Sequence, residues 1–242
     1  MNVLILAAGH TPLQKQDENY PLSLVEFEGI PLIQKLIEQC TSIDSKVKFI
    51  IALRETDVRD YYLDNIVRLL TPDAEILKVS DKTKGAACTA LLAVPHIDND
   101  EELLIINGNE LLDIDFSLPL QDFRRRELDA GVVSFNSVHP RYSYVKIQDD
   151  LVVEAAEKRP ISRHATVGFY WFTKGSIFVK AAKNMIRKDA SVNGLFYICP
   201  SLNELVLEQY KIGMFTIATD LYHPLKNERQ LEQLEAVIER RK

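Results

Sequence analysis

The sequence has few of the residues that mark disulfide-stabilised or nucleic-acid-binding proteins. Only three of its 242 residues are cysteine, and these stand far apart without CxxC or Cys/His spacing. This scarcity argues against a disulfide framework or a zinc site and favours a reducing, cytoplasmic setting. Basic residues are outnumbered by acidic ones, 29 to 35. A phosphate-backbone partner such as nucleic acid is therefore not expected.

Apolar runs long enough to span a membrane are also missing from the sequence. The opening MNVLILAAGH reaches Gly9 after a short apolar run that no basic residue precedes, unlike a signal peptide or a membrane span. It is typical of a first β-strand. Hydrophobic residues make up 46% of the 242 residues, so the chain can bury a large core. We expect one domain over residues 1–242.

Four continuous apolar runs alternate with helical patterns in the first half. This alternation is typical of an α/β protein whose mostly parallel sheet is covered on both faces, so we expect a three-layer αβα sandwich. Thr56 can cap a helix that runs to Leu70, and another helix is expected over roughly 84–94. The apolar runs lie at 3–6, 48–53, 74–79 and 103–106.

Short strand-like stretches dominate the second half, where they could extend the same sheet and wall a cleft. Two stretches with apolar residues at helical spacing, 175–186 and the segment from Asn227, should pack on the core as amphipathic helices. The strand-like stretches lie at 131–138, 144–147, 151–155 and 166–172.

Three segments of small or polar residues each follow a predicted strand, and they form the candidate ligand site. They are the Ala-Ala-Gly turn at 7–9, residues 83–87, and the Asn-Gly-Asn-Glu segment at 107–110. Parallel strands end at the same edge of a sheet, so the three segments should converge there. Turns that bare their backbone N–H groups can hydrogen-bond a base or phosphate without steric hindrance.

The string LAAGHTPLQKQDENYPLSLVEFEGIPLI resembles the opening of nucleotidyltransferases with a GT-A-like α/β fold, which typically read LAAG-x-G-S/T-R and then PKPLVEVxGKPLI. KGAACTALLA resembles their base-binding loop and helix, and LLIINGNELLDID resembles their metal-bearing strand end. EKRPIS, ATVGFYWF and NGLFYICPSLNEL are similar to a subgroup associated with bacterial capsule and surface-polysaccharide synthesis. The resemblance implies transfer of a nucleotidyl group from a nucleoside triphosphate to a phosphorylated sugar or related compound.

The resemblance also implies which residues form the site. Glu157 and Lys158 match a family pair whose lysine contacts the sugar-side phosphate, although a solvated surface pair is an equal reading. Asn203 is either a substrate-site polar group or part of a helix N-terminal turn. The implied nucleotide-binding residues are Leu6, Ala7, Ala8, Gly9, Gly85, Ala86 and Asn107.

Charged residues of the family pattern are replaced in this sequence. The second glycine of the opening loop falls at Thr11, the arginine at Leu13, the lysine of PKP at Leu22 and the metal-binding aspartate at Asn109. The GTPEDL-like turn of the family reads LKNERQL. Nucleotidyl transfer brings two anions together and uses a carboxylate-held Mg²⁺ to neutralise them. An amide at Asn109 brings no charge to such a cation, so the ordinary reaction should be strongly reduced.

Three replacements for the missing charges are open. Glu110 could supply the carboxylate one residue further on, if a loop conformation lets it reach the old position. Lys15 lies in the loop HTPLQKQDEN and could reach a phosphate. Asp113 and Asp115 spell the DxD of metal-dependent glycosyltransferases, although a polar turn is the simpler interpretation of that string.

Three hypotheses follow from these patterns. The first is a working nucleotidyltransferase of surface-polysaccharide precursor metabolism, with rearranged ligands and Mg²⁺ as its cofactor. The second is a catalytically silent subunit that binds a nucleotide or sugar nucleotide. The third is a glycosyltransferase that uses Asp113 and Asp115. A second copy of the chain or a partner subunit could supply the missing cations, as an arginine in trans does elsewhere.

Overall fold

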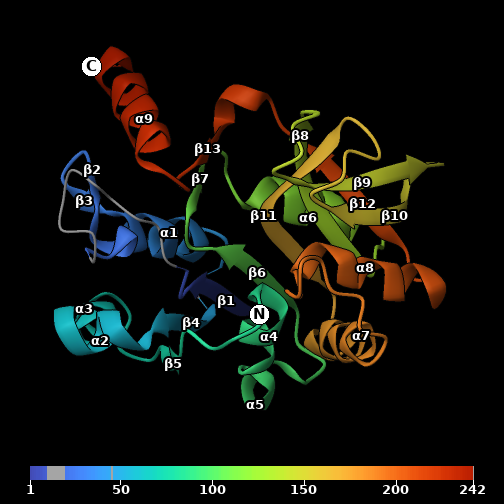
Figure 1. Cartoon of the computed structure of the whole chain (residues 1–242), viewed down its shortest axis with the longest axis horizontal. Helices are drawn as coiled ribbons and strands as arrows, with labels where there is room; N and C mark the ends of the chain where they lie inside the picture. Colours follow the sequence, from blue (N-terminus) through green and yellow to red (C-terminus); the bar gives the residue numbers. More distant parts are fainter. Residues whose placement is uncertain (10–19, 45, 242) are drawn as a thin grey trace.

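The four apolar runs of the first half form the parallel part of a central sheet (Figure 1). The computed structural model describes residues 1–9, 20–44 and 46–241 of the chain. β1 pairs with β4 on one side and with β6 on the other, and β5 follows β4, all in parallel. The expected α/β class with a central, mostly parallel sheet is confirmed. These strands are β1 (Asn2–Ala7), β4 (Lys48–Arg54), β5 (Glu75–Val79) and β6 (Leu103–Asn107).

The strand-like stretches of the second half extend this sheet, as expected. β11 pairs antiparallel with β6, and from β11 the sheet continues through β9 and β10 and, separately, through β8 and β12. The result is a nine-stranded mixed sheet. These strands are β8 (Ala130–Asn136), β9 (Ser143–Gln148), β10 (Leu151–Glu157), β11 (His164–Phe172) and β12 (Ile212–Thr216).

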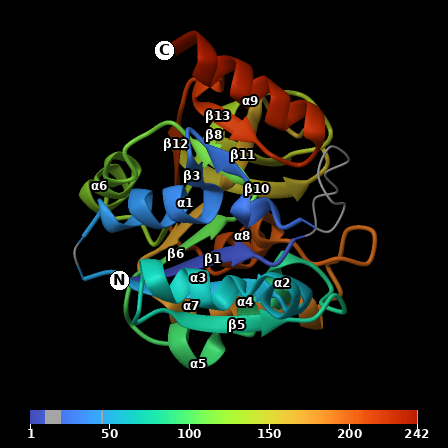
Figure 2. The same ribbon diagram turned by 90° about the vertical axis from the view of Figure 1, so that its left-hand side faces the viewer.

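Helices cover both faces of the sheet, because alternate side chains of each strand point to opposite faces. Val3 and Ile5 of β1 pack in a core with α1, α3 and α6, whereas Leu4 packs in a second core with α4, α5, α7 and α8. In Figure 2, α1 and α6 lie above β1 and β6, and α5 lies below them. The helices are α1 (Leu32–Thr41), α3 (Leu63–Leu70), α4 (Ala86–Leu91), α5 (Val94–Ile97), α6 (Ser117–Arg125), α7 (Gly175–Arg187) and α8 (Ile198–Leu207).

The helix expected over residues 56–70 is divided in two. α2 (Glu55–Tyr61) and α3 are separated by Tyr62, whose φ of 54° lies in the left-handed region. The predicted capping role of Thr56 is wrong, because α2 begins before it and the Thr56 hydroxyl is buried without a hydrogen-bond partner among the described residues. The helix expected over roughly 84–94 is shorter, because α4 covers residues 86–91 and a separate helix, α5, begins at Val94.

Short elements complete the edge of the sheet where the parallel strands end. β7 (Glu110–Leu112) pairs antiparallel with β13 (Tyr222–Pro224), which follows the short helix η2 (Thr219–Leu221). The remaining elements are η1 (Leu22–Leu24), β2 (Glu26–Phe27), β3 (Ile30–Pro31) and the final helix α9 (Glu228–Arg241). Within the described residues, no helix has the length and apolar character needed to cross a bilayer.

Candidate functional site

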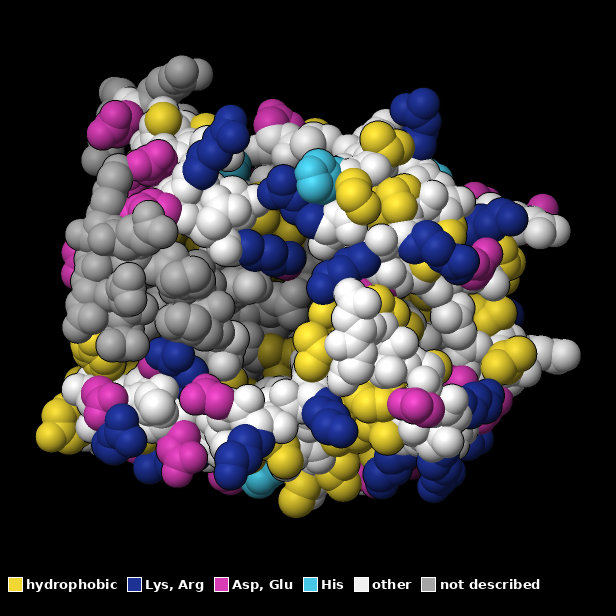
Figure 3. All heavy atoms as spheres, in the orientation of Figure 1, with side chains coloured by type: hydrophobic (Ala, Val, Ile, Leu, Met, Phe, Trp, Pro, Cys, Tyr) yellow, Lys and Arg dark blue, Asp and Glu magenta, His cyan; other side chains and the backbone are white. Residues whose placement is uncertain are grey.

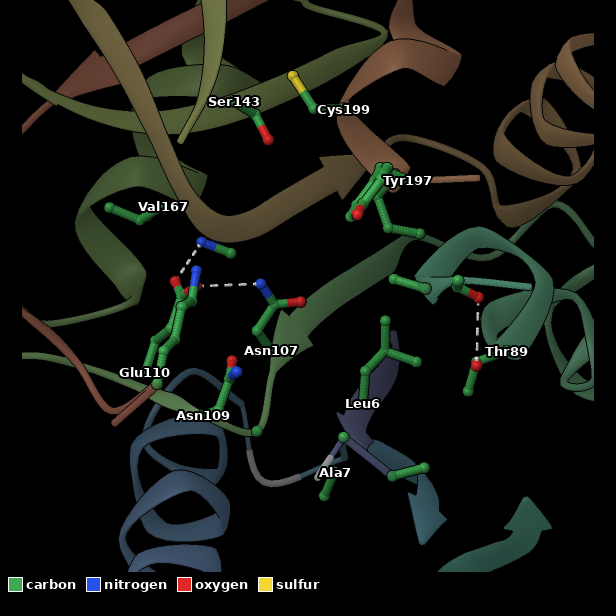
Figure 4. A pocket seen from close by; sticks show the side chains of 18 of the residues that line it. Leu6, Ala7, Thr89, Asn107, Asn109, Glu110, Ser143, Val167, Tyr197 and Cys199 are labelled. Carbon is green, nitrogen blue, oxygen red and sulfur yellow. Dashed lines mark hydrogen bonds and ion pairs between the residues drawn. The ribbon is translucent and has the colours of Figure 1, made fainter. Parts of the chain in front are cut away.

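A pocket of about 490 Å³ opens at the carboxyl edge of the parallel strands. Gly9, Gly85 and Asn109, one from each of the three candidate segments, all line it. The structure therefore brings these segments together, as the order of strand ends predicts. Figure 3 shows basic side chains next to the hollow in the middle of this face, and Figure 4 shows the pocket from close by.

The ends of β1 and β6 meet closely at Gly108. Its N–H donates to the Leu6 carbonyl at 2.9 Å, and a Cβ added to Gly108 would lie 2.7 Å from the Cα of Ala7. Only glycine allows this approach. Four of the residues predicted to bind a nucleotide also line the cavity here, namely Leu6, Ala7, Ala8 and Asn107.

A tight loop before α4 forms another wall. Gly85 has a φ of 100°, and a Cβ at this position would lie 2.4 Å from the Phe196 carbonyl oxygen. That oxygen accepts a hydrogen bond from Ala87 N at 3.0 Å, and Phe196 N donates to Lys84 O at 2.8 Å. The loop is thus fixed by the segment before α8, and it presents Gly85 and Ala86 to the pocket.

Glu110 is a buried carboxylate at the centre of the site, with only 5% of its surface exposed. Its Oε2 accepts a hydrogen bond from Gly168 N at 2.7 Å, and its Oε1 accepts one from Asn107 Nδ2 at 3.2 Å. Figure 4 shows the contact between Asn107 and Glu110 as a dashed line. The Lys226 ammonium completes the set, because Nζ lies 2.9 Å from Glu110 Oε1.

The β7–β13 ladder carries Lys226 to this position. Pro224 pairs with Glu110 in the ladder, and just beyond it Leu225 N donates to the Asn109 carbonyl at 2.9 Å. Lys226 then turns into the pocket wall. Burial lowers the pKa of Lys226, but the charge of Glu110 and its hydrogen bond outweigh that effect, so the net pKa is raised. Lys226 is therefore a cation at neutral pH.

Glu157 and Lys158 lie at the end of β10 on another wall of the pocket. Lys158 Nζ donates to the Tyr197 hydroxyl at 2.8 Å and lies 4.9 Å from the centre of that ring. Ser143 Oγ donates to the Glu157 carboxylate. Burial raises the pKa of Glu157, and the Ser143 hydrogen bond and the charge of Lys158 oppose the shift.

Other predicted site residues do not reach the pocket. Asn203 uses both polar atoms of its amide on the backbone of Ala155 in β10. Asp113 lies 3.2 Å from His223 Nε2, while Asp115 Oδ1 accepts a hydrogen bond from Ser117 N at 2.8 Å, at the start of α6. The DxD string is thus a turn and a helix start. Lys15, like Leu13, lies outside the residues that the structure describes.

One curated protein is similar in sequence to most of this chain. The bifunctional protein GlmU of Methanocaldococcus jannaschii is 26% identical to this chain over 219 residues, which make up 88% of this chain and 49% of that protein. The chain therefore spans about half the length of this curated relative. No protein-family model matches the chain.

Solved structures with a similar fold cover nearly the whole chain. The nucleoside-diphosphate-sugar pyrophosphorylase from Vibrio cholerae RC9 has a TM-score of 0.83 at 19% identity, covering 98% of this chain and 100% of that one. The chain has the fold of the nucleotidyltransferases. The inositol-1-phosphate CTP transferase from T. maritima has a TM-score of 0.69 at 16% identity, covering 98% and 96%.

This fold implies a divalent metal, and the described residues do not fit one. Asn109 offers an uncharged amide, and the neighbouring carboxylate of Glu110 already binds Gly168 N, Asn107 and Lys226. In the part of the chain that the structure describes, no three His, Cys, Asp or Glu side chains are grouped as metal ligands. Mg²⁺ is commonly held by one or two open carboxylates together with the phosphates of the substrate. Asn109 and Glu110 offer no such carboxylate, and the cofactor role of Mg²⁺ stays a prediction.

Sequence reasoning overlooked two cations of the pocket, Lys226 and Arg141. Lys226 lies in LKNERQL, the stretch that aligns with the family's GTPEDL-like turn, where a basic residue is a departure from the pattern. That departure was the available signal. Arg141 follows a loop, and its guanidinium lies against the His139 ring, with Nε 3.1 Å from Nδ1. No local pattern marks Arg141 as a pocket residue.

Proposed function

We propose that this chain is a sugar-nucleotidyltransferase-like protein whose pocket binds a nucleoside triphosphate or a sugar nucleotide. One observation carries the proposal: the ends of β1 and β6 and the loop before α4 converge on a single 490 Å³ pocket whose other walls hold Lys158 and Lys226. Backbone on one side and ammonium groups on the other suit a ligand with a planar base and a phosphate chain.

Each of the two kinds of wall binds a different part of the ligand. Ala8, Gly9 and Gly85 bring little or no side chain, so a base can approach their backbone closely. Lys158 stands at the end of β10 and is held by Tyr197, so it can contact the phosphate that is attached to the sugar. In this assignment Glu157 orients the sugar hydroxyls from the same wall, where a buried carboxylate accepts hydrogen bonds well.

In this proposal the pocket binds its ligand but catalyses nucleotidyl transfer only slowly. The metal position is occupied by Asn109, and the lysine position of the opening motif is Leu22, which is buried in the core. Each lost charge-stabilising group can raise a barrier by about 3–4 kcal/mol. We therefore favour a nucleotide-sugar binding protein of surface-polysaccharide precursor metabolism over an efficient transferase. The glycosyltransferase alternative is not favoured, because Asp113 and Asp115 bind other groups.

A binding panel tests the proposal directly. Titration calorimetry with ATP, CTP, GTP, UTP and the corresponding diphosphate sugars should identify at least one ligand with a dissociation constant below 1 mM, or about 4 kcal/mol of binding free energy. Lys158→Met should weaken the binding of sugar nucleotides by about tenfold, equal to 1.4 kcal/mol. The control Lys180→Met removes a lysine from an exposed pair with Glu208 and should leave binding unchanged.

Two results would count against this function. Absence of binding across the whole panel at millimolar concentration would show that the pocket is not a nucleotide site. Pyrophosphate release at turnover rates of about 1 s⁻¹ or more, typical of working enzymes, would establish the transferase in place of the binding protein.

A further inference from the structure

We propose that Lys226, held by the buried Glu110, serves as a built-in cation in place of a divalent metal and binds the phosphate of the ligand directly. Phosphate binding in this pocket should then be independent of Mg²⁺. The inference rests on the proposed function for the identity of the whole ligand, but a simple phosphate probe tests it separately.

The position of Lys226 is the first argument. Asn109 stands where the nucleotidyltransferase pattern has its metal-binding aspartate, and the backbone of Asn109 is hydrogen-bonded to Leu225, the residue before Lys226. Lys226 Nζ lies 2.9 Å from Oε1 of Glu110, the residue after Asn109. A fixed positive charge thus occupies the immediate surroundings of the expected metal position.

The exposure of the two partners is the second argument. Glu110 is 5% exposed, whereas the Lys226 side chain is 37% exposed and lines the open pocket. A lysine ammonium has three N–H donors, and the contact with Glu110 Oε1 uses one of them. The buried carboxylate therefore anchors Lys226, and the ammonium lines the pocket with N–H donors that Glu110 does not use.

The hydrogen bonds of Glu110 are the third argument. Gly168 N and Asn107 Nδ2 donate to its two carboxylate oxygens. Hydrogen bonds to the charged form stabilise a buried carboxylate, so the ion pair with Lys226 needs no further cation. Lys158 and Arg141 line the same pocket and offset the carboxylate of Glu157.

A metal ion at the same place is disfavoured by the same contacts. A divalent cation near Glu110 would have to displace the ammonium and would be repelled by it at short range, where few screening ions enter. Asn109 could still offer its amide to a phosphate as a hydrogen-bond donor. The chemistry of this corner thus matches an anion better than a cation.

Inorganic pyrophosphate is the probe for the test, and its binding is measured by calorimetry once with EDTA and once with excess Mg²⁺. Diphosphate sugars from the binding panel are measured in the same way, because they chelate Mg²⁺ less than free pyrophosphate does. We expect the dissociation constant of the unmodified protein for these sugars to change by less than about twofold on adding Mg²⁺, a difference under 0.5 kcal/mol. Pyrophosphate should bind in EDTA.

Three substitutions test whether pyrophosphate binding depends on the ammonium group of Lys226. Lys226→Met should weaken pyrophosphate binding in EDTA by about tenfold or more, and Lys226→Arg should retain most of it, since both side chains carry the charge. Lys188→Met is the matched control, because Lys188 likewise pairs with a largely buried carboxylate, Glu204, and neither residue lines the pocket. It should bind pyrophosphate like the unmodified protein.

A double variant controls for the loss of stability that Lys226→Met causes. Lys226→Met leaves Glu110 buried without its cation, which destabilises proteins strongly. The double variant Glu110→Gln/Lys226→Met removes both charges and keeps an amide that can accept from Gly168 N. It should fold, as judged by its thermal transition, and should bind pyrophosphate as weakly as the single variant.

The outcomes separate this inference from the proposed function. Mg²⁺ that tightens diphosphate-sugar binding by tenfold, a Lys226→Met or double variant that binds like Lys188→Met, or unmodified protein that does not bind pyrophosphate would each overturn the inference. Pyrophosphate binding that depends on Lys226, together with no binding of any nucleotide or sugar nucleotide, would support the inference while the proposed function fails.

Discussion

Asn203 in α8 holds Ala155 in β10 by both of its backbone groups. Asn203 Nδ2 donates to the Ala155 carbonyl and Oδ1 accepts from the Ala155 N–H, each at 2.8 Å. β10 is the last strand on its side of the sheet, so its outer backbone groups need another partner. The amide supplies that partner. Asn203 thereby fixes the strand that ends in Glu157 and Lys158.

Asn203→Ala should therefore lower stability and leave the pocket chemistry intact. Loss of two hydrogen bonds to buried backbone should reduce the free energy of unfolding by about 1–3 kcal/mol, measured by urea denaturation. Ligand dissociation constants should stay within about twofold. As a control, Asn184→Ala removes an amide that contacts only a neighbouring exposed arginine on α7 among the described residues and should cost less than about 0.5 kcal/mol. A specific loss of ligand affinity in Asn203→Ala, at unchanged stability, would restore the substrate-binding interpretation.

Gly85→Ala should damage both stability and binding. Its φ of 100° strains any other residue, and the new Cβ would lie 2.4 Å from the Phe196 carbonyl. Strain of this kind costs about 1–3 kcal/mol, and the displaced loop should weaken nucleotide binding by more than tenfold. Gly29→Ala separates the two causes, because Gly29 also has a positive φ of 75° but open space around it. That control should lose some stability in thermal unfolding and no affinity. Equal binding by both variants would contradict the assignment of this loop to the ligand.

The pH dependence of stability should contain a contribution from Glu157. Burial raises the pKa of its carboxyl in the folded chain, above the unfolded value of about 4.3. As the pH rises, the unfolded chain loses this proton first. The contribution of Glu157 to the stability of the folded chain therefore decreases as the pH passes from the unfolded to the folded pKa, and it remains unfavourable at higher pH. Glu157→Gln has no proton to lose.

Urea unfolding of the two proteins at two pH values measures this contribution. We subtract the free energy of unfolding of the unmodified protein from that of Glu157→Gln. This difference should be larger, in favour of the variant, at pH 7 than at pH 4, which is about the unfolded pKa. Gln keeps an oxygen for the Ser143 hydroxyl, so the hydrogen bond is preserved in the comparison. An identical difference at both pH values would show that the Glu157 carboxyl has an ordinary pKa.

Asn109→Asp should not convert the pocket into a metal-dependent transferase by itself. The added carboxylate would share the ammonium of Lys226, which already binds Glu110. Combining it with Lys226→Ala leaves two carboxylates without a fixed cation, a set that suits Mg²⁺. We expect calorimetric Mg²⁺ binding that is at least tenfold tighter in the double variant than in either single variant.

Turnover should remain absent even in that double variant. The lysine position of the opening motif stays apolar at Leu22, which is 7% exposed, so the triphosphate lacks one of its usual cations. Pyrophosphate release is measured with four nucleoside triphosphates and a panel of phosphorylated sugars. Release above background by Asn109→Asp alone would show that the amide was the one missing element.

The strands and the pocket turns could be predicted because their signals are local. A run such as Leu103–Asn107 is apolar at nearly every position and is bordered by small residues, which is typical of a strand covered on both faces. Glycines such as Gly85 and Gly108 stand where the backbone needs a left-handed conformation or a close approach. Both features follow from short stretches of sequence.

The division at Tyr62 and the charge at Lys226 could not be predicted in this way. Tyr62 adopts a left-handed conformation that its side chain disfavours, and the packing of Val58 and Leu63 in the same core holds it there. Lys226 meets Glu110 through a ladder between two segments that lie far apart in the chain, β7 and β13. A contact between segments so far apart is not visible in either segment alone, and only the departure of LKNERQL from the family turn marks Lys226.

The β7–β13 ladder also sets the order in which this protein can be completed. It joins Glu110 to Pro224, so the chain must form nearly the whole sheet before the two segments meet, and contacts of high sequence separation form late and slowly. During synthesis, a partial chain ending before residue 222 can bury β1, β4 and β6 but holds Glu110 without its cation. We expect such a partial chain to be least stable around Glu110.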